Sequence, residues 1–467
     1  MVFSTPIFAV FLLIVFAVYW LVQRFDLKWQ NLFVLVASYV FYGWWDWRFL
    51  TLIALSTIID FVSANRIAQS SEQTHRKKWV SISLFSNLGM LFFFKYFNFF
   101  VGELEVLFKT FGIHTDTWTL SIILPVGISF YTFQTLSYTL DVYNRKMEPT
   151  NNLLQFAAYV SFFPQLVAGP IERAKHLLPQ FSHRRTFDVG LAKAGVRLII
   201  WGLFKKIVIA DSLAPIVNEI FANYHDMSGG TLAVGAVLFA FQIYGDFSGY
   251  SDIAIGTARL LGFELMSNFK FPYFSRNIGE FWRKWHISLS TWFRDYLYIP
   301  LGGSRGNRIS QIRNVFIIFI VSGFWHGANW TFIAWGAFHA ILFLPMLLLG
   351  TNRKHVSDDA STNYGIGEWI SVIATFVCVC IGWVFFRAES FTDALLYFKG
   401  MTKGGNLENG YYITFPLILL LLEWPIRQDE RLEQLNLGKL EIPVLGFVMM
   451  LVFVFRETAT EFIYFQF

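Results

Sequence analysis

The chain has 467 residues, of which 55% are hydrophobic and 19% aromatic, while only 15% are charged. This composition excludes an ordinary soluble enzyme of this length and predicts an integral membrane protein. In such a chain the formal net charge of +5 concerns the placement of Lys and Arg among the loops, and no nucleic-acid partner is expected. Cys378 and Cys380 stand two positions apart and do not face each other, so we expect neither a disulfide nor a metal site.

Apolar segments of spanning or nearly spanning length recur along the whole chain. They cover residues 6–23, 31–46, 49–65, 79–101, 119–141, 189–221, 231–260, 314–331, 332–350, 367–386, 411–424 and 442–458. A spanning helix needs about 20 apolar residues, so these segments predict about eleven or twelve crossings in a single membrane domain, residues 1–467. The first segment follows Met1-Val-Phe-Ser, without a basic leader or a small-residue cleavage site, and is expected to be a retained helix.

Basic residues crowd some loops and are scarce in others, which indicates the topology. Residues 66–78, 173–206 and 270–313 are rich in Lys and Arg, whereas residues 222–231 contain none. If the basic loops are cytoplasmic, the N-terminus lies outside, provided that residues 152–168 are re-entrant or interfacial. Two prolines and a glycine within residues 161–173 predict a broken or re-entrant helix there.

Polar side chains interrupt the apolar segment at residues 241–252, where a lipid-facing helix would not carry them. Asp246 and Tyr250 lie four positions apart, as do Ser248 and Asp252, so each pair would share one face of a helix. This pattern predicts a protein-lined cavity in place of a simple helical bundle.

His326 lies within an apolar run that begins at Asn314. If the helix starts near Asn314, a rise of about 1.5 Å per residue places His326 roughly 18 Å along it, near the middle of a hydrocarbon layer about 30 Å thick. An ionisable group is costly at that depth, which favours a functional role. The alternative is a histidine that packs between helices and hydrogen-bonds a neighbour.

His286 is a second candidate, in a basic and aromatic segment at residues 281–300. The segment predicts an amphipathic interfacial helix, so an interfacial histidine is the alternative to a functional one. The loop that follows, residues 301–308, lacks the Gly-Lys-Ser/Thr ending of a nucleotide-hydrolysing phosphate loop. Its glycines, with Arg305 and Arg308, could still hold an anionic group such as the phosphates of a coenzyme.

His339 has no polar neighbours in the sequence and is expected to be structural. No zinc-ligand spacing and no Gly-x-Ser-x-Gly elbow occurs among the remaining histidines and serines. We therefore expect general base catalysis without a covalent serine step.

Seven motifs in order along nearly the whole chain carry a family resemblance. They are Pro125-Val-Gly-Ile-Ser-Phe-Tyr-Thr-Phe-Gln, Phe163-Pro-Gln-Leu-Val-Ala-Gly-Pro-Ile, Asp246-Phe-Ser-Gly-Tyr-Ser-Asp, Phe281-Trp-Arg-Lys-Trp-His-Ile-Ser-Leu-Ser, Tyr298-Ile-Pro-Leu-Gly-Gly, Phe324-Trp-His-Gly-Ala-Asn-Trp and the ending Phe462-Ile-Tyr-Phe-Gln-Phe467. Together they resemble the membrane-bound O-acyltransferase family, in its bacterial branch of alginate O-acetyltransferases.

The resemblance implies an all-α integral membrane protein, with its transmembrane helices and further re-entrant or interfacial helices arranged around a central funnel. It implies that His326 is the catalytic histidine and general base, and that His286 is a second catalytic position. An acyl thioester, expected to be acetyl-CoA, would enter from the cytoplasm, and an acceptor hydroxyl from the outside. No permanently bound cofactor and no metal are implied.

Further site residues are assigned beside the two histidines. Ser322, one helical turn before His326, and Asn329, three residues after it, would orient the ring or stabilise the oxyanion. The remaining assignments are Asp246, Tyr250, Trp325 and Arg283 for substrate binding, and Arg305 and Arg308 for the donor. The expected partners are membrane lipids, the thioester donor, and an extracytoplasmic polysaccharide such as alginate or a periplasmic acyltransferase partner protein, at a bacterial cytoplasmic (inner) membrane.

Other functions fit the same sequence. Peptidoglycan O-acetylation and teichoic-acid D-alanylation would use the same chemistry, the latter with a D-alanyl carrier protein docked on the basic cytoplasmic surface. A proton-coupled transporter would instead use His326, Asp246 and Asp252 as a relay. A non-catalytic scaffold for polymer export would tolerate replacement of His326.

Overall fold

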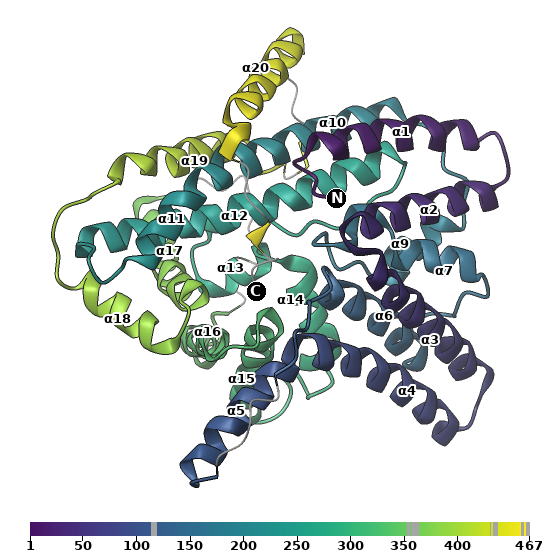
Figure 1. The fold of residues 1–467 in the computed structure, drawn as a ribbon, viewed down its shortest axis with the longest axis horizontal. Coiled ribbons are helices and arrows are strands. Elements are labelled where there is room, and N and C mark those ends of the chain that lie inside the picture. Colours follow the sequence, from purple (N-terminus) through teal and green to yellow (C-terminus); the bar gives the residue numbers. More distant parts are fainter. Residues whose placement is uncertain are drawn as a thin grey trace. The chain divides into compact units, whose positions relative to one another are not determined.

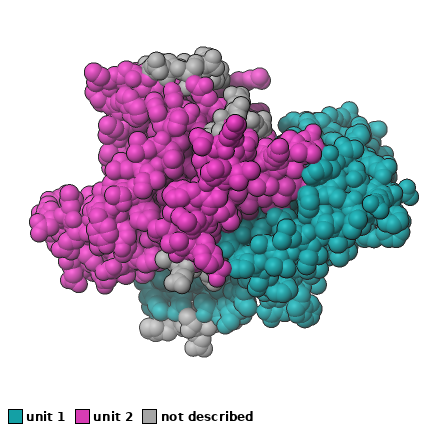
Figure 2. All heavy atoms as spheres, turned by 90° about the horizontal axis from the view of Figure 1, so that it is seen from above, with its two compact units in different colours: residues 1–187, 261–265 teal, residues 188–260, 266–467 magenta. Residues whose placement is uncertain are grey.

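The computed structural model describes residues 1–113, 119–352, 355, 364–429, 431–432, 438–458 and 462–463, and every element assigned in these ranges is a helix. The chain forms two compact units (Figure 2). The first holds residues 1–187 and 261–265, and the second holds residues 188–260 and 266–467. Both units are helical, which confirms the predicted fold class, and the single-domain organisation stays a prediction.

The first unit is built from helices (Figure 1). Its elements are α1 (Pro6–Val22), α2 (Leu27–Asp46), η1 (Trp47–Phe49), α3 (Leu50–Gln69), α4 (Gln73–Leu91), η2 (Phe92–Tyr96), α5 (Phe97–Thr110), α6 (Ile128–Tyr143), α7 (Leu153–Val160), α8 (Phe163–Leu166), α9 (Ala174–Leu177) and η3 (Leu178–Phe181). The break between α7 and α8 confirms the broken helix predicted at residues 161–173.

A buried carboxylate joins three helices of this unit. Asp60 on α3 accepts hydrogen bonds from Ser83 and Asn87 on α4, the latter at 2.8 Å, and from Thr139 on α6 at 3.2 Å. The amide oxygen of Asn87 in turn accepts from Ser56 at 2.8 Å. Because a buried carboxylate is costly unless it is hydrogen-bonded, these donors stabilise both the charge and the packing of the three helices.

The second unit contains all the candidate site residues. Its elements are α10 (Val189–Leu203), η4 (Phe204–Asp211), α11 (Ser212–Ala222), α12 (Gly229–Leu260), η5 (Pro272–Phe274), α13 (Ile278–Lys284), α14 (Ile287–Phe293), η6 (Arg294–Tyr298), α15 (Arg308–His326), α16 (Trp330–Leu348), α17 (Ile366–Arg387), α18 (Phe391–Met401), η7 (Gly410–Ile413), α19 (Thr414–Ile426), η8 (Gly438–Leu440), α20 (Glu441–Val454) and η9 (Phe455–Thr458).

Helices α10 and α12 pack side by side through glycines (Figure 1). A Cβ on Gly202 would lie 2.5 Å from the carbonyl oxygen of Gly249, and a Cβ on Gly195 would lie 2.7 Å from that of Gly256. Small residues let the two backbones approach closely, as they do between membrane helices generally. The contact fixes α12, whose residues are mostly buried, as the central helix of the unit.

Six helical runs in the described ranges are long and apolar enough to cross a membrane: Leu27–Gln69, Gln73–Thr110, Gly229–Leu260, Arg308–His326, Trp330–Leu348 and Ile366–Arg387. Two shorter apolar helices, Pro6–Val22 and Gly410–Ile426, accompany them. The run Leu27–Gln69 takes in two of the apolar segments predicted from the sequence, 31–46 and 49–65, while other predicted segments, such as 442–458, fold into helices of fewer than 18 residues. The protein is a multi-pass membrane protein.

Candidate functional site

His326 is the last residue of α15, and Gly327 after it is extended (φ −164°, ψ 152°). The assumption that this helix starts near Asn314 is wrong, because Asn307 caps it and it begins at Arg308. Asn307 accepts a hydrogen bond from the amide of Ser310, which satisfies one of the free donors of the first turn. His326 therefore lies about 27 Å along the helix axis from Arg308, at the opposite end of α15.

His286 lies where α13 ends and α14 begins. Its backbone is left-handed (φ 42°, ψ 55°), a conformation that costs a non-glycine residue free energy and turns the chain sharply. The single amphipathic helix predicted at residues 281–300 is therefore wrong, and the His286 side chain is buried within the protein, only 1% exposed. Burial lowers the pKa of His286 to about 3, so its ring is neutral near neutral pH.

The two histidines share an aromatic enclosure. Their ring centroids are 6.4 Å apart, and the ring of Trp325 lies 4.9 Å from His326 and 6.0 Å from His286. Trp335 and Phe386 each lie 5.3 Å from His326 on its other sides. His326 is 4% exposed and His286 1% exposed, so both imidazoles are buried within this enclosure.

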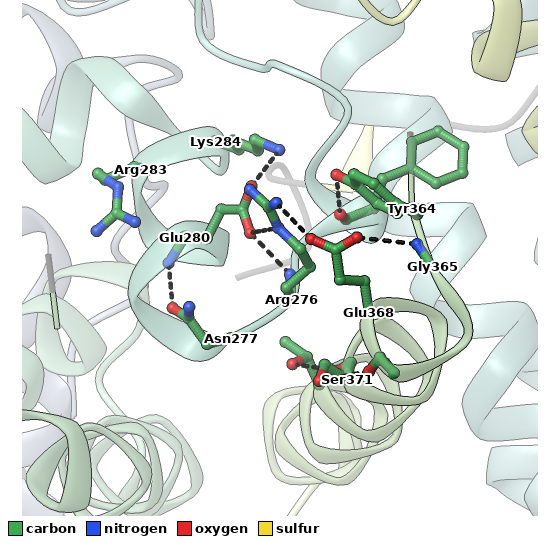
Figure 3. Close-up of polar contacts among 12 residues, drawn as sticks. Arg276, Asn277, Glu280, Arg283, Lys284, Tyr364, Gly365, Glu368 and Ser371 are labelled. Carbon is green, nitrogen blue, oxygen red and sulfur yellow. Dashed lines mark hydrogen bonds and ion pairs between the residues drawn. The ribbon is translucent and has the colours of Figure 1, made fainter. Parts of the chain in front are cut away.

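A polar cluster fixes the segment that leads to His286 (Figure 3). The Arg276 guanidinium donates to Glu280 on α13 at 3.1 Å and to Glu368 on α17 at 3.2 Å, and Lys284 donates to Glu280 at 2.8 Å. Burial acts to raise the pKa of Glu280, but the hydrogen bonds from Arg276 and the charge of Lys284 outweigh it and hold the pKa below its usual value. The cluster thus joins α13 to the first turn of α17, whose last turn carries Phe386.

Asp246 and Tyr250 both lie on α12, with their side chains against other parts of the unit. Asp246 forms an ion pair with Lys206 at 2.8 Å and accepts a hydrogen bond from the backbone amide of Ile463 at 2.6 Å. The centroid of the Tyr250 ring lies 4.9 Å from that of Phe462, with the two ring planes tilted by 36°. The structure brings both residues to the segment near residue 463, and their role in substrate binding stays a prediction.

Three predicted site residues lie close to His326 in the sequence, and their side chains make different contacts. They are Ser322, Trp325 and Asn329. Ser322 is buried one turn earlier on α15, and Trp325 forms a wall of the histidine enclosure. The Asn329 carboxamide accepts from the Thr331 amide at 3.0 Å, which caps α16, and donates to the Glu389 carbonyl at 2.9 Å. Asn329 therefore holds the end of α17 beside the turn that follows His326, and its contact with substrate stays a prediction.

The two arginines assigned to the donor lie away from the histidine pair, whereas Arg283 is in the last turn of α13, three residues before His286. Arg305 and Arg308 are exposed at the start of α15, about 27 Å along the axis from His326. Asn314 holds their loop in place by donating to the carbonyl of Gly303 at 3.0 Å. Arg283 is half-buried and donates to the carbonyl of Asn352 at 3.0 Å.

Two buried lysines in an apolar segment are absent from the site residues predicted from the sequence. Lys205 and Lys206 are on the π-helical turn η4, where Lys205 pairs with Asp252 at 2.6 Å and Lys206 with both Asp211 at 2.7 Å and Asp246. Ionisable residues are uncommon within apolar membrane segments and often have a function there. The two adjacent lysines of Phe204-Lys-Lys-Ile are therefore a feature by which sequence analysis could have found them. The lysines neutralise the carboxylates of α12.

The fold and this enclosure define a class: a multi-pass helical membrane protein with two buried histidines at helix ends. Residues 39–388 match the model of MBOAT, the membrane-bound O-acyltransferase family. The chain belongs to this family and is an O-acyltransferase.

Named relatives cover most of the chain. It is 42% identical over 408 residues to the probable alginate O-acetylase AlgI of Azotobacter vinelandii, which covers 87% of this chain and 79% of that protein. It is 34% identical over 430 residues to the peptidoglycan O-acetyltransferase of Helicobacter pylori, over 86% and 80% of the two chains. Its identity to the teichoic acid D-alanyltransferase of Bacillus subtilis is 26% over 283 residues, 58% and 70% of the two chains.

Proposed function

We propose that the protein transfers an acetyl group from acetyl-CoA to a hydroxyl of an extracytoplasmic polysaccharide, alginate or a related polymer. The observation that carries the proposal is the buried pair of His326 and His286 in one aromatic enclosure, 6.4 Å apart between ring centroids. Identity of 42% to the alginate relative, against 34% and 26% to the relatives named for other polymers, supports acetyl and alginate over the alternatives.

His326 acts as the general base in the proposed reaction. The neutral imidazole takes the proton of the acceptor hydroxyl while the hydroxyl oxygen attacks the thioester carbonyl carbon. The tetrahedral intermediate then collapses, the carbon–sulfur bond breaks, and the thiolate leaves with the proton from the imidazolium. The products are an acetyl ester and a free thiol, and His326 returns to its neutral form.

The position of His326 at a helix end favours this proton transfer. The C-terminal end of a helix carries a partial negative charge, which stabilises a cation in the last turn by about 0.3–1 kcal/mol, and by up to about 2 kcal/mol in partly buried geometries. His326 is the last residue of α15, so the imidazolium formed in the reaction gains this stabilisation. Exclusion of water by Trp325, Trp335 and Phe386 strengthens the electrostatic interactions within the enclosure.

The donor side is proposed from the charge pattern. Basic residues gather in the loop before α15, including Arg305 and Arg308, and basic loops are cytoplasmic in membrane proteins. A donor whose phosphates bind there must span about 27 Å along α15 to bring its thioester to His326. The proposed location is the cytoplasmic (inner) membrane of a bacterium, and a periplasmic acyltransferase partner protein is the alternative acceptor.

The test uses purified full-length protein in lipid, acetyl-CoA labelled in its acetyl group, and oligomannuronate as acceptor. We expect release of coenzyme A and labelled oligosaccharide, and we expect His326→Ala to abolish both while its thermal unfolding stays that of a folded protein. His75→Ala is the control, because His75 lies on α4 of the first unit, where its ring accepts a hydrogen bond from Trp79 at 3.2 Å. Full activity of the His326→Ala protein would remove the base role.

The same preparation separates the competing functions. Labelling from a D-alanyl carrier protein but not from acetyl-CoA would favour D-alanyl transfer. Labelling of a peptidoglycan fragment in place of oligomannuronate would change the acceptor. Proton-coupled solute flux that is equal with and without the thioester would contradict the proposed reaction and favour a transporter.

A further inference from the structure

A second polar pocket lies in the same unit, outside the histidine enclosure. It has a volume of about 240 Å³, which corresponds to the space of about eight water molecules. Its walls come from the ends of α11 and α17 and from α18 (Figure 1). The lining residues that carry polar groups are Tyr224, His225, Arg387, Glu389, Asp393 and Tyr397.

The walls combine aromatic faces with hydrogen-bonding groups. The rings of Tyr224 and His225 lie 4.0 Å apart, and Tyr397 stacks on Phe221 at 4.6 Å. Tyr224 donates its hydroxyl to Asp393 at 2.8 Å. Binding pockets for small molecules share this composition, in which apolar and aromatic walls carry a few placed polar groups.

The charges in the pocket suit hydroxyl groups. Hydrogen bonds from Ser390 and Tyr224 hold the pKa of Asp393 below its usual value, so the carboxylate is charged and accepts further hydrogen bonds. Arg387 is anchored by the amide oxygen of Asn218 at 2.8 Å and lies over the Phe221 ring at 5.6 Å. An exposed carboxylate, Glu389, completes the set.

The pocket adjoins the histidine enclosure through two direct links. Phe386, whose ring is 5.3 Å from His326, immediately precedes Arg387. Asn329, three residues after His326, donates to the carbonyl of Glu389 at 2.9 Å. The pocket is therefore at the His326 end of the helices, opposite the basic start of α15, and its loop at residues 222–231 contains no Lys or Arg, as expected for the extracytoplasmic side.

We propose that this pocket binds one pyranose unit of the polysaccharide acceptor, with Asp393, Glu389 and Arg387 hydrogen-bonding its hydroxyls and Tyr224 packing against its ring. The proposal rests on the proposed function, because it assigns the acceptor subsite of the same reaction. It also gives a role to the hydrogen bond from Asn329 to the Glu389 carbonyl. That bond connects the segment that would hold the sugar to the turn that follows the base, His326.

Binding is measured first without chemistry. His326→Ala protein in lipid is titrated by calorimetry with oligomannuronate and, separately, with a neutral chito-oligosaccharide. We expect at least one oligosaccharide to bind, and we expect Asp393→Asn to weaken that binding about tenfold, as for loss of a charge-assisted hydrogen bond. Tyr224→Phe keeps the ring and removes the hydroxyl, so it serves as a conservative second variant. The matched control is Asp226→Asn, an exposed residue of the same loop that does not line the pocket.

Kinetics in the otherwise unaltered protein provide the second readout. In the Asp393→Asn protein the KM for the acceptor rises about tenfold, and kcat falls by less than that, because the change affects binding. Unchanged binding and KM in both the Asp393→Asn and Tyr224→Phe proteins would overturn the pocket while leaving the proposed reaction intact. Oligosaccharide binding that depends on Asp393, in a protein that transfers no acyl group, would keep the pocket and refute the reaction.

Discussion

Gly323, one turn before His326, gives the sharpest test of how the site is built. A Cβ at this position would lie 2.1 Å from the backbone carbonyl oxygen of Phe332 on α16, whereas ordinary van der Waals contact begins at 3.4 Å. The Gly323→Ala protein must therefore move the two backbones apart by 1.3 Å, the difference between those distances. A carbonyl oxygen within a helix cannot rotate away as a side-chain end can.

We expect this backbone displacement to lower the rate of acyl transfer more than it lowers the stability of the fold. Overpacking of this kind costs about 1–3 kcal/mol of stability, whereas a misplacement of about 1 Å can reduce a rate about 100-fold. We therefore expect kcat for acyl transfer to fall about 100-fold in the Gly323→Ala protein, with a cooperative thermal unfolding transition retained.

The measurement is kcat for acyl transfer alongside thermal unfolding in the same detergent or lipid. Gly446→Ala on α20 is the matched control, since a Cβ there meets no atom within 4 Å and alanine favours the helix by roughly 0.5–1 kcal/mol. Full kcat in the Gly323→Ala protein, at unchanged stability, would refute the claim that close contact of α15 and α16 places His326.

Three further outcomes concern buried charges, each read by thermal unfolding. Lys206→Met removes the cation that pairs with Asp246 and should lower the free energy of unfolding by about 3–5 kcal/mol. Lys193→Met, at an exposed lysine, should lower it little. Equal stability of the two variants would contradict the ion pairing. Glu280→Gln should destabilise the protein by about 1–3 kcal/mol at neutral pH. Because the folded pKa of Glu280 lies below the usual 4.5, this stabilisation is complete above pH 4.5 and disappears as the pH falls through the folded pKa; a difference between wild type and variant that persists under strong acid would argue against it. Asp60→Ala should cost about 1–3 kcal/mol for each donor it leaves unpaired, and an unchanged melting temperature would contradict that network.

The all-helical fold class and the positions of the long apolar helices could be predicted, because the hydropathy of a segment depends only on its own residues. The runs that became α15, α16 and α17 were recognisable from length and composition, and the break at residues 161–162 followed from Pro164. Boundaries were less predictable: the first seven residues of α15, from Arg308 to Asn314, are polar for the most part and helical although their side chains do not suit a bilayer.

Partners remote in sequence explain the remaining differences. The sequence pairs Asp246 with Tyr250 through helical spacing, but its ion-pair partner Lys206 comes from η4, 40 positions earlier. His286 lies in a stretch whose basic and aromatic composition suits an interface, yet the left-handed turn at the histidine itself directs the ring inward. Neither effect is visible in local composition, because one depends on tertiary contact and the other on a single backbone angle.

The hydrogen bond between Asp246 and the amide of Ile463 also has a consequence for biosynthesis. The two residues are 217 positions apart, and at roughly 5–20 residues per second a ribosome needs about 10–40 s to synthesise the chain between them. Throughout that interval α12 is already made while Asp246 lacks its backbone donor, so Lys206 must neutralise the carboxylate early. The central helix of the unit is thus charge-neutralised by a segment that precedes it and receives its last hydrogen bond from a segment that is translated after α20.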